Sequence, residues 1–507
     1  MQLELGVDRI VLAVAVLLLA AVLTAALAAK PGSRFRVPGA LLFLVIGMLV
    51  GDDGFGWLSV DDPAFVRDVG VVALLLILFE GGLTTKPSDL RIAALPGLLL
   101  STVGVLVTAA VTGLGVWVLL DVDVLTAALI GSVVASTDAA AVFSMMRTTP
   151  LPRRVSALLR IESGANDPIA VMLTVGLLAT IETGAVGPGT WAAFAAVQLL
   201  GGGVVGAGVG LAGVWLLRRV ELGVEGLYPV LAMAIAGVAY GAAAWLGASG
   251  FVAVYLAGLL IGGQVPRHRR SVLGFHESMA NAAEVGLFLL LGLLVFPSRL
   301  PTVAFAGVAI AAILIVIARP IAVWLCTLGS HVPWRHQVVA NAAGLRGAVP
   351  IVLATFPFTA GIAGGSQIFD VVFFVVLLSV LVQGTALLPI VRFLGLEDDR
   401  PAWAPVAEAL PLDGIDVDLV ELFVTDDLVV ANKRLRDLPE LEATLVAAIV
   451  RDHRVLIPKG DMVVLPGDVL LLTAQRDGDI LARLTAWARG EEGQRSRPRP
   501  RTGDDDR

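Results

Sequence analysis

The chain has 507 residues, of which 57% are hydrophobic and 16% are charged. A soluble globular chain has about 45–50% apolar and about 25% charged residues, so this composition excludes an ordinary soluble protein. The average hides a division, because residues 1–395 carry 21 Lys/Arg and 20 Asp/Glu, whereas residues 396–507 carry 15 and 23. The tail therefore supplies the whole net charge of −7, and we expect a membrane body followed by a charged, soluble tail.

Thirteen hydrophobic segments are candidates for crossing a hydrocarbon core about 30 Å thick. They fall at residues 8–28, 38–51, 65–83, 92–118, 124–146, 155–181, 189–217, 226–246, 249–263, 280–296, 301–327, 336–358 and 369–393. The first lacks the basic start and the small-residue cleavage site of a signal peptide, so we predict that it is a span. The lone cysteine, Cys326, lies in an apolar run, which indicates a buried thiol rather than a disulfide, zinc or redox site.

Positive charges alternate from one connection to the next. The connections that follow odd-numbered predicted spans hold Lys30, Arg34, Arg36, Lys86, Arg91, Arg147, Arg153, Arg154, Arg218, Arg219, Arg267, Arg269, Arg270 and Arg335. The other connections hold only Arg67 and Arg299. Because cytoplasmic loops are enriched in Lys and Arg, we predict that the N-terminus lies outside and the tail lies in the cytoplasm.

Seven ionisable residues are candidates for a position deep inside the membrane, where a charge is costly and marks a functional site. They are Glu80, Asp138, Glu162, Asp167, Glu284, Arg319 and Arg346. Because two arginines cannot neutralise five acids, at least one carboxylate must be protonated or hold a cation. Burial disfavours the charged carboxylate and a nearby cation favours it, so a proton and a metal ion would compete for one site. This competition is the requirement for proton-coupled cation exchange.

Two predicted spans are interrupted near their centres. Residues 136–138 place Ser, Thr and Asp in a row, and a uniform helix would turn at least one of them toward lipid. Residues 344–350 contain two glycines and a proline around Arg346, which weaken a helix. The two interruptions are seven spans apart, so the first six and last six spans can form inverted repeats. Interrupted segments at matching places in inverted halves indicate a transport site near the midplane.

The sixth predicted span carries a polar sequence, ESGANDP, at residues 162–168. Helical spacing stacks Glu162 with Asn166 and Ser163 with Asp167 on one face. Pro168 has no amide hydrogen to donate to the carbonyl of Gly164, so that oxygen is also free. Hard cations such as Na⁺ bind oxygens of these kinds. The alternative is that the acids only pair with the two buried arginines; we favour pairing for Glu162 and cation binding for Asp167.

Several motifs resemble those of monovalent cation/proton antiporter family 1, the NhaP-type exchangers. They are LFEGGL at 78–83, STDAAAV at 136–142, ESGANDP at 162–168, RP at 319–320 and GLRG at 344–347. The resemblance covers nearly all of residues 1–395. It implies an all-α membrane protein with thirteen transmembrane helices, inverted repeats and two crossing broken helices. It also implies a homodimer in which a six-helix core moves against a dimerisation domain in an elevator-like cycle.

The resemblance also implies roles for individual residues. Asp167 would carry the cation and the proton, with further oxygens from Ser163, Glu80 and the Thr137 backbone, and Asp138 would line the site at the first interruption. Asn166 stands where electrogenic relatives have a second aspartate, which implies electroneutral one-for-one exchange. The remaining implied roles are a core ion pair, Glu162 with Arg319, and a charge that counters the helix ends at the second interruption, Arg346. Glu284 stands where a glutamine is expected, and it is either a protonated structural residue or an additional cation contact.

The tail resembles the C-terminal half of potassium-conductance regulator domains, also called TrkA-C or RCK-C domains. Short apolar runs at 417–424, 445–450, 455–457 and 469–473 predict a small β-rich α/β domain over 412–488, after a linker at 396–411. A Gly-x-Gly-x-x-Gly sequence is absent from the tail, which argues against a dinucleotide of the NAD type. Such domains pair and can bind small regulators such as cyclic dinucleotides; a purely structural cap is an equal alternative. The composition of residues 489–507 predicts disorder.

Two other classes of function are less well supported. A ligand-gated potassium channel would fit the tail, but the sequence STVGV at 101–105 lacks the Tyr-Gly that completes a selectivity filter. An intramembrane hydrolase needs a buried base, and all five histidines fall in loops, at a span edge or in the tail. They are His268, His276, His331, His336 and His453.

We therefore predict a transporter and not an enzyme. It would exchange K⁺, or with nearly equal support Na⁺ (or Li⁺), for H⁺ and serve pH homeostasis. We expect a homodimer in the bacterial plasma membrane, with lipid, the monovalent cation and the proton as its partners and no nucleic acid. We expect no cofactor, apart from a small regulatory ligand on the tail.

Overall fold

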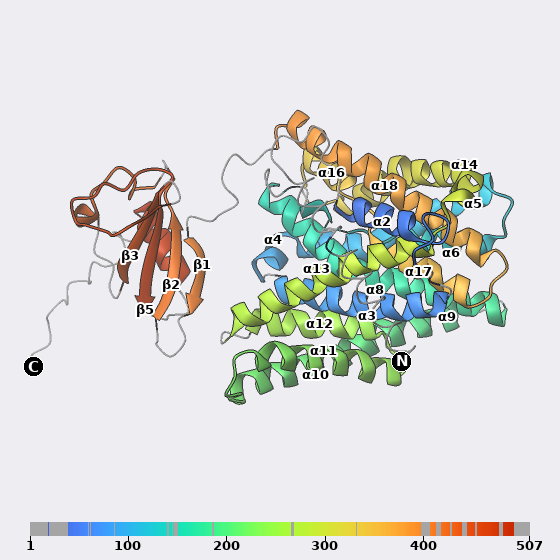
Figure 1. Cartoon of the computed structure of the whole chain (residues 1–507), viewed down its shortest axis with the longest axis horizontal. Coiled ribbons are helices and arrows are strands. Elements are labelled where there is room, and N and C mark those ends of the chain that lie inside the picture. Colours follow the sequence, from blue (N-terminus) through green and yellow to red (C-terminus); the bar gives the residue numbers. More distant parts are fainter. Residues whose placement is uncertain are drawn as a thin grey trace, which may run out of the picture. The chain divides into compact units, whose positions relative to one another are not determined.

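A computed structural model describes most of the chain. The described residues are 19, 39–58, 60, 62–85, 87–138, 141–143, 146, 151–184, 187–264, 268–330, 332–396, 406–411, 417–425, 428–438, 444–451, 454–475 and 480–490. The chain divides into two compact units, Met1–Glu397 and Asp398–Arg507. The first is helical and the second is built around a sheet (Figure 1).

The helices of the first unit follow the hydrophobic pattern of the sequence. They are α2 (Gly39–Val50), α3 (Pro63–Thr84), α4 (Pro87–Leu99), α5 (Val105–Leu119), α6 (Val124–Val133), α8 (Arg153–Thr183), α9 (Pro188–Ala196), α10 (Gly202–Arg219), α11 (Leu227–Trp245), α12 (Gly250–Gln264), α13 (Arg269–Leu294), α14 (Leu300–Ala312), α15 (Arg319–Thr327), α16 (Trp334–Ala342), α17 (Ala348–Thr359) and α18 (Gly365–Phe393). Short π-helical turns join α4 to α5, α9 to α10 and α14 to α15, at Leu100–Gly104, Val197–Gly201 and Ile313–Ala318. Each of these three pairs therefore continues as one long helix.

Seven helices within the described residues are long and apolar enough to cross a membrane. They are Ala93–Leu119, Arg154–Thr183, Pro188–Arg219, Leu227–Trp245, Ser271–Leu294, Pro297–Thr327 and Gly365–Phe393. Shorter apolar helices lie at Leu41–Val50, Val124–Val133, Gly250–Gln264 and Ala348–Thr359. The body is thus a polytopic helical membrane protein. The first predicted span, 8–28, lies almost entirely outside the described residues.

The largest difference from the predicted spans concerns α13. The hydrophobic pattern predicts a span from residue 280, whereas the helix begins at Arg269. Its first three turns mix charged and polar residues with apolar ones, so their mean hydropathy is too low to predict a membrane-spanning helix. This extension corrects the placement of His276, which lies inside α13 and is only 1% exposed, not in a loop.

Glycines let several helices approach at backbone distance. On α10, Gly202, Gly206 and Gly210 recur every four residues, and a Cβ at Gly206 would lie 2.6 Å from the Ala253 Cα of α12. A Cβ at Gly258 of α12 would lie 2.6 Å from the carbonyl oxygen of Phe79 in α3. Small residues at this spacing drive helix association in lipid, where burial of apolar surface gives little advantage. They explain the close packing of α12 beside α10 and α3 (Figure 1).

The second unit contains a five-stranded antiparallel sheet in the order β1-β2-β5-β3-β4. The strands are β1 (Val406–Pro411), β2 (Val417–Phe423), β3 (Thr444–Arg451), β4 (Arg454–Leu456) and β5 (Val469–Gln475), and helix α19 (Ile480–Arg489) follows them. Its apolar core is formed by alternate residues such as Val420, Leu422, Leu470 and Leu472, together with Trp487 of α19. The last four strands match the apolar runs predicted as strands.

Two features of this unit were not apparent from the sequence. Strand β1 falls in the segment predicted as a linker. Its sequence, VAEALP, contains two alanines and is bounded by prolines, so it lacks the apolar run from which the other strands are predicted. As an edge strand it tolerates Pro411. The buried carboxylate of Asp468, in the sequence Pro-Gly-Asp at 466–468, accepts hydrogen bonds at 2.7 Å from Nε and Nη2 of Arg451. This bidentate pair ties the turn before β5 to the end of β3. Residues 491–507 of the predicted disordered tail lie outside the described residues.

Candidate cation and proton site

The first predicted interruption is present, and its position fits the polar run. Helix α6 ends at Val133, and residues 134–138 are not helical. The carboxylate of Asp138 accepts a hydrogen bond of 3.2 Å from the amide of Ala141, where a helical turn resumes. The break therefore exposes backbone groups and turns the side chains of 136–138 into the protein, where Ser136 and Thr137 are buried.

The second interruption is shorter than predicted. Helix α16 ends at Ala342 and α17 begins at Ala348, so Pro350 lies inside the first turn of α17 and not in the break. A proline is tolerated there because the amides of a first helical turn have no intrahelical acceptor. The non-helical segment is thus 343–347, and it contains Arg346, which is 1% exposed.

The two interruptions touch each other. The amide of Asp138 donates a hydrogen bond of 2.8 Å to the carbonyl of Leu345. The carboxylate of Asp138 lies against Gly347, the residue that precedes α17, since a Cβ at Gly347 would be 2.1 Å from Asp138 Oδ2. The positive end of the α17 dipole therefore faces a carboxylate. On the other side of the break, Arg346 Nη1 donates a hydrogen bond of 3.1 Å to the carbonyl of Gly344, just beyond the negative end of α16.

Helix α8 carries the polar sequence of the sixth predicted span. It runs unbroken through Pro168, and Glu162, Asn166 and Asp167 are all at most 5% exposed. Asp167 Oδ1 is buried and makes no hydrogen bond with any described residue. A buried carboxylate oxygen without a partner is costly unless a proton or a cation satisfies it.

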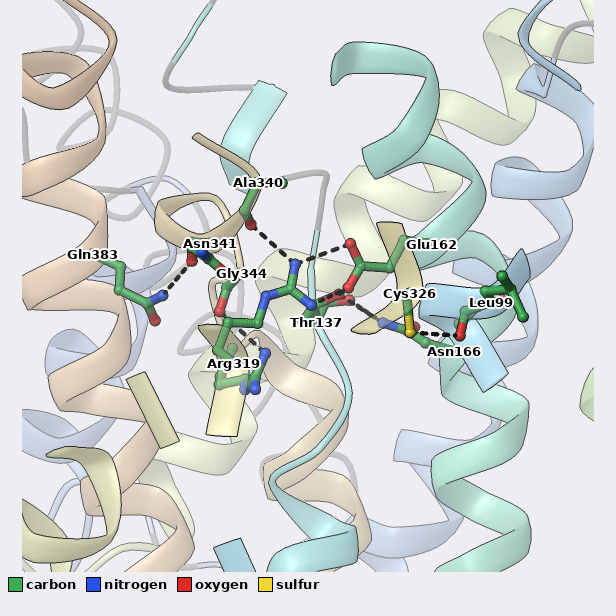
Figure 2. A network of polar contacts seen from close by, with 12 residues as sticks. Leu99, Thr137, Glu162, Asn166, Arg319, Cys326, Ala340, Asn341, Gly344 and Gln383 are labelled. Atoms are coloured by element: carbon green, nitrogen blue, oxygen red, sulfur yellow. Dashed lines mark hydrogen bonds and ion pairs between the residues drawn. The ribbon is translucent and has the colours of Figure 1, made fainter. Parts of the chain in front are cut away.

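A polar network joins α8 to the first interruption and to α15 (Figure 2). Asn166 Nδ2 donates to Thr137 Oγ1 at 2.6 Å and to the Thr137 carbonyl at 3.3 Å. Thr137 Oγ1 in turn lies 3.4 Å from Glu162 Oε1. Arg319 binds both carboxylate oxygens of Glu162, with Nη2 3.0 Å from Oε2, and the same Nη2 is 3.0 Å from the carbonyl of Ala340. The Glu162–Arg319 ion pair is thus buried and bridges three helices.

Arg319 is positioned by its helix. It begins α15 directly after the π-helical turn at Ile313–Ala318. A π-helical turn inserts one extra residue and so changes the face on which later side chains lie. Gly344 makes room for the guanidinium, because a Cβ there would lie 2.5 Å from Arg319 Nε.

The environment of Arg346 contains residues that the sequence analysis missed. The Arg346 amide donates to Ser379 Oγ at 3.1 Å, and Ser379 Oγ donates to Gln383 Oε1 at 2.6 Å. Gln383 Nε2 donates to the carbonyl of Asn341 at 3.3 Å. Ser379 and Gln383 are one helical turn apart in the mostly apolar central part of α18. The sequence signal for this hydrogen-bonded pair is the presence of two polar residues four positions apart within a predicted span.

The remaining candidate carboxylates gather near Asp138. Glu284 of α13 interacts electrostatically with both Asp138 and Glu80, and Asp138 also interacts with Asp167. Glu80 and Glu284 are half-buried, whereas Asp167 is buried. Ser163 is half-buried on α8, one turn before Asp167. The fold thus groups Glu80, Asp138, Asp167 and Glu284 and separates Glu162, which pairs with Arg319.

His276 is the one described histidine that is almost fully buried, but its surroundings are apolar. Its Nδ1 lies 2.7 Å from the carbonyl of Val272, and its ring packs edge-on against Phe79. Within the described residues, no group of three or more His, Cys, Asp or Glu is arranged to hold a metal ion. The oxygens available to a cation come instead from single carboxylates, hydroxyls, amides and backbone carbonyls.

Comparisons with known proteins identify the family of the chain. Residues 17–393 match the family described as sodium/hydrogen exchanger, transmembrane, and residues 419–486 match the TrkA-C domain. The chain is 38% identical to a protein of Shewanella sp. (strain MR-4) named K(+)/H(+) antiporter NhaP2, over 87% of this chain and 78% of that one. It is 36% identical to the K(+)/H(+) antiporter NhaP of Alkalimonas amylolytica, over 90% and 80%.

A solved structure shows the same fold. The sodium proton antiporter MjNhaP1 from Methanocaldococcus jannaschii at pH 8 aligns with a TM-score of 0.65 and 22% identity, over 76% of this chain and 100% of that one. The family match covers the whole membrane body from the first predicted span to α18. The chain therefore belongs to the sodium/hydrogen exchanger family, and it is a monovalent cation/proton antiporter with a TrkA-C domain near its C-terminal end.

Proposed function

We propose that this antiporter exchanges K⁺ for H⁺, with Na⁺ as the closest alternative cation. The observation that carries the exchange itself is the buried, unpartnered Oδ1 of Asp167 beside the first helix interruption. The choice of K⁺ is supported by relatives that share both the membrane body and the tail and are named K(+)/H(+) antiporters. Selectivity among alkali ions depends on the spacing of the oxygens, and the donor set itself accepts K⁺, Na⁺ or Li⁺.

In this proposal Asp167 is the carrier. Its carboxylate is buried, and an uncompensated charge is unfavourable there. It therefore binds either a proton or a cation, and each expels the other. Asn166 is neutral, and its side-chain nitrogen is hydrogen-bonded to Thr137. Asn166 and Asp167 together therefore offer one carboxylate and not two. One carboxylate that alternates between one proton and one monovalent cation gives electroneutral, one-for-one exchange.

The other candidate oxygens would complete the cation's shell. Ser163, Glu80 and the Thr137 backbone are proposed to contribute directly, and Asp138 lines the site. Glu162 and Arg319 are proposed to keep α8 and α15 together without touching the cation. Arg346 is proposed to compensate the carbonyls that the second interruption leaves unpaired, in line with its bond to Gly344.

The proposed transport cycle is of the elevator type in a homodimer. A core that contains both interruptions would carry the bound ion across the membrane against a dimerisation domain. Thirteen spans with inverted repeats and an external N-terminus fit the alternating loop charges, and they place the TrkA-C domain in the cytoplasm of the plasma membrane. There it would regulate exchange, with a small ligand such as a cyclic dinucleotide, while the membrane body itself needs no cofactor and catalyses no covalent chemistry.

Proteoliposomes test the proposal directly. Purified protein is reconstituted with a pH-sensitive dye inside the vesicles, and equal gradients of K⁺, Na⁺ or Li⁺ are applied in turn. We expect saturable, cation-driven proton flux that is fastest with K⁺ and unaffected by clamping the voltage. Asp167→Asn should abolish this flux, whereas Glu182→Gln, at the far end of the same helix, should leave it unchanged.

Each alternative gives a different result in the same vesicles. Preference for Na⁺ or Li⁺ would overturn the choice of cation but not the exchange. Flux that follows voltage and needs no proton gradient would indicate a channel. Full activity in Asp167→Asn would show that the carrier is a different residue.

A further inference from the structure

Three oxygen atoms near the first interruption are buried without a hydrogen-bond partner. They are Ser136 Oγ, Asn166 Oδ1 and Asp167 Oδ1, on residues that are 1%, 0% and 5% exposed. More than nine in ten buried polar groups in proteins have a partner, so three orphaned oxygens on adjoining segments need an explanation. Asp167 and Asn166 are already part of the candidate site, whereas Ser136 has no assigned role.

Ser136 has lost the partner that a helix would have given it. One turn earlier, Ser132 Oγ donates a hydrogen bond of 2.9 Å to the carbonyl of Ala128, as serine does inside a helix. Ser136 lies three residues beyond Val133, where α6 ends, and the carbonyl of Ser132 is occupied by the amide of Ala135. The interruption therefore releases the Ser136 hydroxyl from the backbone.

The freed hydroxyl lies next to the proposed carrier. The Ser136 hydroxyl is within hydrogen-bonding reach of the Asp167 carboxylate, and neither Ser136 Oγ nor Asp167 Oδ1 makes a hydrogen bond of full geometry with any described residue. A cation bound to the Asp167 carboxylate would therefore lie beside this hydroxyl.

In Asn166 the side-chain oxygen, and not the nitrogen, is the atom without a hydrogen-bond partner. Its Nδ2 is used twice, by Thr137 Oγ1 and by the Thr137 carbonyl, and both of these contacts need a donor (Figure 2). This fixes the orientation of the amide and leaves Oδ1 as the unsatisfied atom. A hydroxyl oxygen, an amide oxygen and a carboxylate oxygen are all hard ligands of the kind that an alkali cation binds.

We propose that Ser136 Oγ is a direct ligand of the transported cation, which it shares with Asp167 and the side-chain oxygen of Asn166. Ser136 then contributes to cation affinity and to the choice among alkali ions, because each oxygen of the shell replaces a water of hydration. The assignment rests on the proposed function of Asp167 as the carrier. It adds a ligand from the interrupted segment to the ligands on α8.

Ser136→Ala tests the assignment against a matched control, Ser132→Ala. Both serines are buried and lie four residues apart, but only the hydroxyl of Ser132 is satisfied by its own helix. In proteoliposomes at fixed pH, Ser136→Ala should raise the apparent KM for the preferred cation about tenfold, which corresponds to about 1.4 kcal/mol of binding free energy. The maximal rate should stay within about twofold, and Ser132→Ala should change neither quantity.

Ser136→Cys provides a second measurement that a purely structural role would not affect. The thiol is close in size to the hydroxyl but is a soft ligand, so the apparent KM for K⁺ should rise while the soft cation Tl⁺ competes more strongly than in the wild type. An unchanged KM and an unchanged Tl⁺-to-K⁺ ratio would overturn the assignment. The wild type and Asp167→Asn are measured in the same vesicles. If the wild type shows no cation-driven proton flux, the proposed function fails; if it does and the Ser136 variants match it, only the role of Ser136 fails.

Discussion

The amide of Asp138 donates a hydrogen bond of 2.8 Å to the carbonyl of Leu345, so the two interrupted helices are joined backbone to backbone. The carboxylate of Asp138 lies at the last residue of the opposite break, against Gly347. The hydrogen bond holds the two interruptions together in this structure, and the proposed site lies where they meet. The contact therefore makes the two breaks one structural unit.

Gly347→Ala should disrupt this unit. A Cβ there would lie 2.1 Å from Oδ2 and 2.7 Å from both Cβ and Cγ of Asp138, so the whole side chain would have to move. Displacement of a site group by about 1 Å can reduce a rate about 100-fold, and we expect exchange to fall by about 10- to 100-fold. Gly237→Ala is the control, because nothing lies within 4 Å of a Cβ at that position in α11. Normal exchange in Gly347→Ala would contradict the proposed role of Asp138 at the site.

The Glu162–Arg319 pair should matter for stability more than for the chemistry of exchange. Both side chains are at most 3% exposed, and the removal of one partner of a buried ion pair typically costs about 3–5 kcal/mol. We expect Arg319→Ala and Glu162→Gln each to lower the midpoint of thermal unfolding of the purified protein strongly. Replacement of both residues by apolar ones, as in Glu162→Leu with Arg319→Met, should recover part of the loss.

A different result would change the role of the pair. If Glu162→Gln abolished exchange while folding and unfolding temperature stayed normal, Glu162 would act in transport and not as a structural partner. The bond from Asn166 through Thr137 to Glu162 is the route by which such an effect could reach the site.

The sequence predicts the chemistry of this site better than its geometry. Hydropathy locates the long apolar helices, and the polar run at 136–138 and the glycines around Arg346 reveal both interruptions, because each violates a simple local rule. The hydrogen bond between Asp138 and Leu345 joins residues far apart in the chain, and no local pattern encodes it. The hydropathy pattern also does not predict the start of α13 at Arg269, because the first turns of this helix are amphipathic and a window average combines them with the adjoining loop.

Two kinds of residue were missed for physical reasons. Ser379 and Gln383 are neutral, so a search for charges inside spans passes over them although they hold the Arg346 backbone. Ser136 was noticed only as part of a polar run, because the loss of its partner depends on where α6 ends, at Val133. The predicted linker, 396–411, includes β1, because an edge strand has fewer neighbours to pack against and its sequence can be less hydrophobic than that of a central strand.

Ser379→Ala should destabilise the second interruption. It removes the acceptor of the Arg346 amide and the donor to Gln383, and both groups would be left buried. An unsatisfied buried group costs about 1–3 kcal/mol, so we expect a clear decrease in the unfolding midpoint measured by thermal shift in detergent. Thr385→Ala, on the exposed face of the same helix, removes a hydroxyl that donates to the Leu381 and Val382 carbonyls of its own helix, and it should be nearly neutral. Equal midpoints for the two variants would contradict the support role of Ser379.

The start of α6 gives a prediction for the dependence of stability on pH. Asp123 precedes the helix, and its Oδ1 accepts hydrogen bonds from the amides of Leu125 at 2.9 Å and Thr126 at 3.0 Å. Hydrogen bonds from the hydroxyl and then the amide of Thr126 hold the pKa of Asp123 below its usual value of 3.8. Because the pKa in the folded state lies below that in the unfolded state, the ionised cap stabilises the protein at every pH above the unfolded value. This stabilisation is lost as the pH falls through the folded value.

Asp123→Ala should therefore lower stability by the same amount at pH 7 and pH 5. We expect about 0.5–1 kcal/mol, at the low end for an N-cap because the side chain is solvent-exposed. The difference from the wild type should shrink as the pH falls below 3.8 and through the lowered pKa of Asp123, where the wild-type carboxylate becomes protonated and loses its advantage. Unfolding midpoints of the two proteins at pH 7, 5 and 3 measure this, with Asp121→Ala as the control for removal of a loop carboxylate. A difference that already disappears between pH 7 and pH 5 would mean that a group other than Asp123 controls the start of α6, and with it the position of the first interruption.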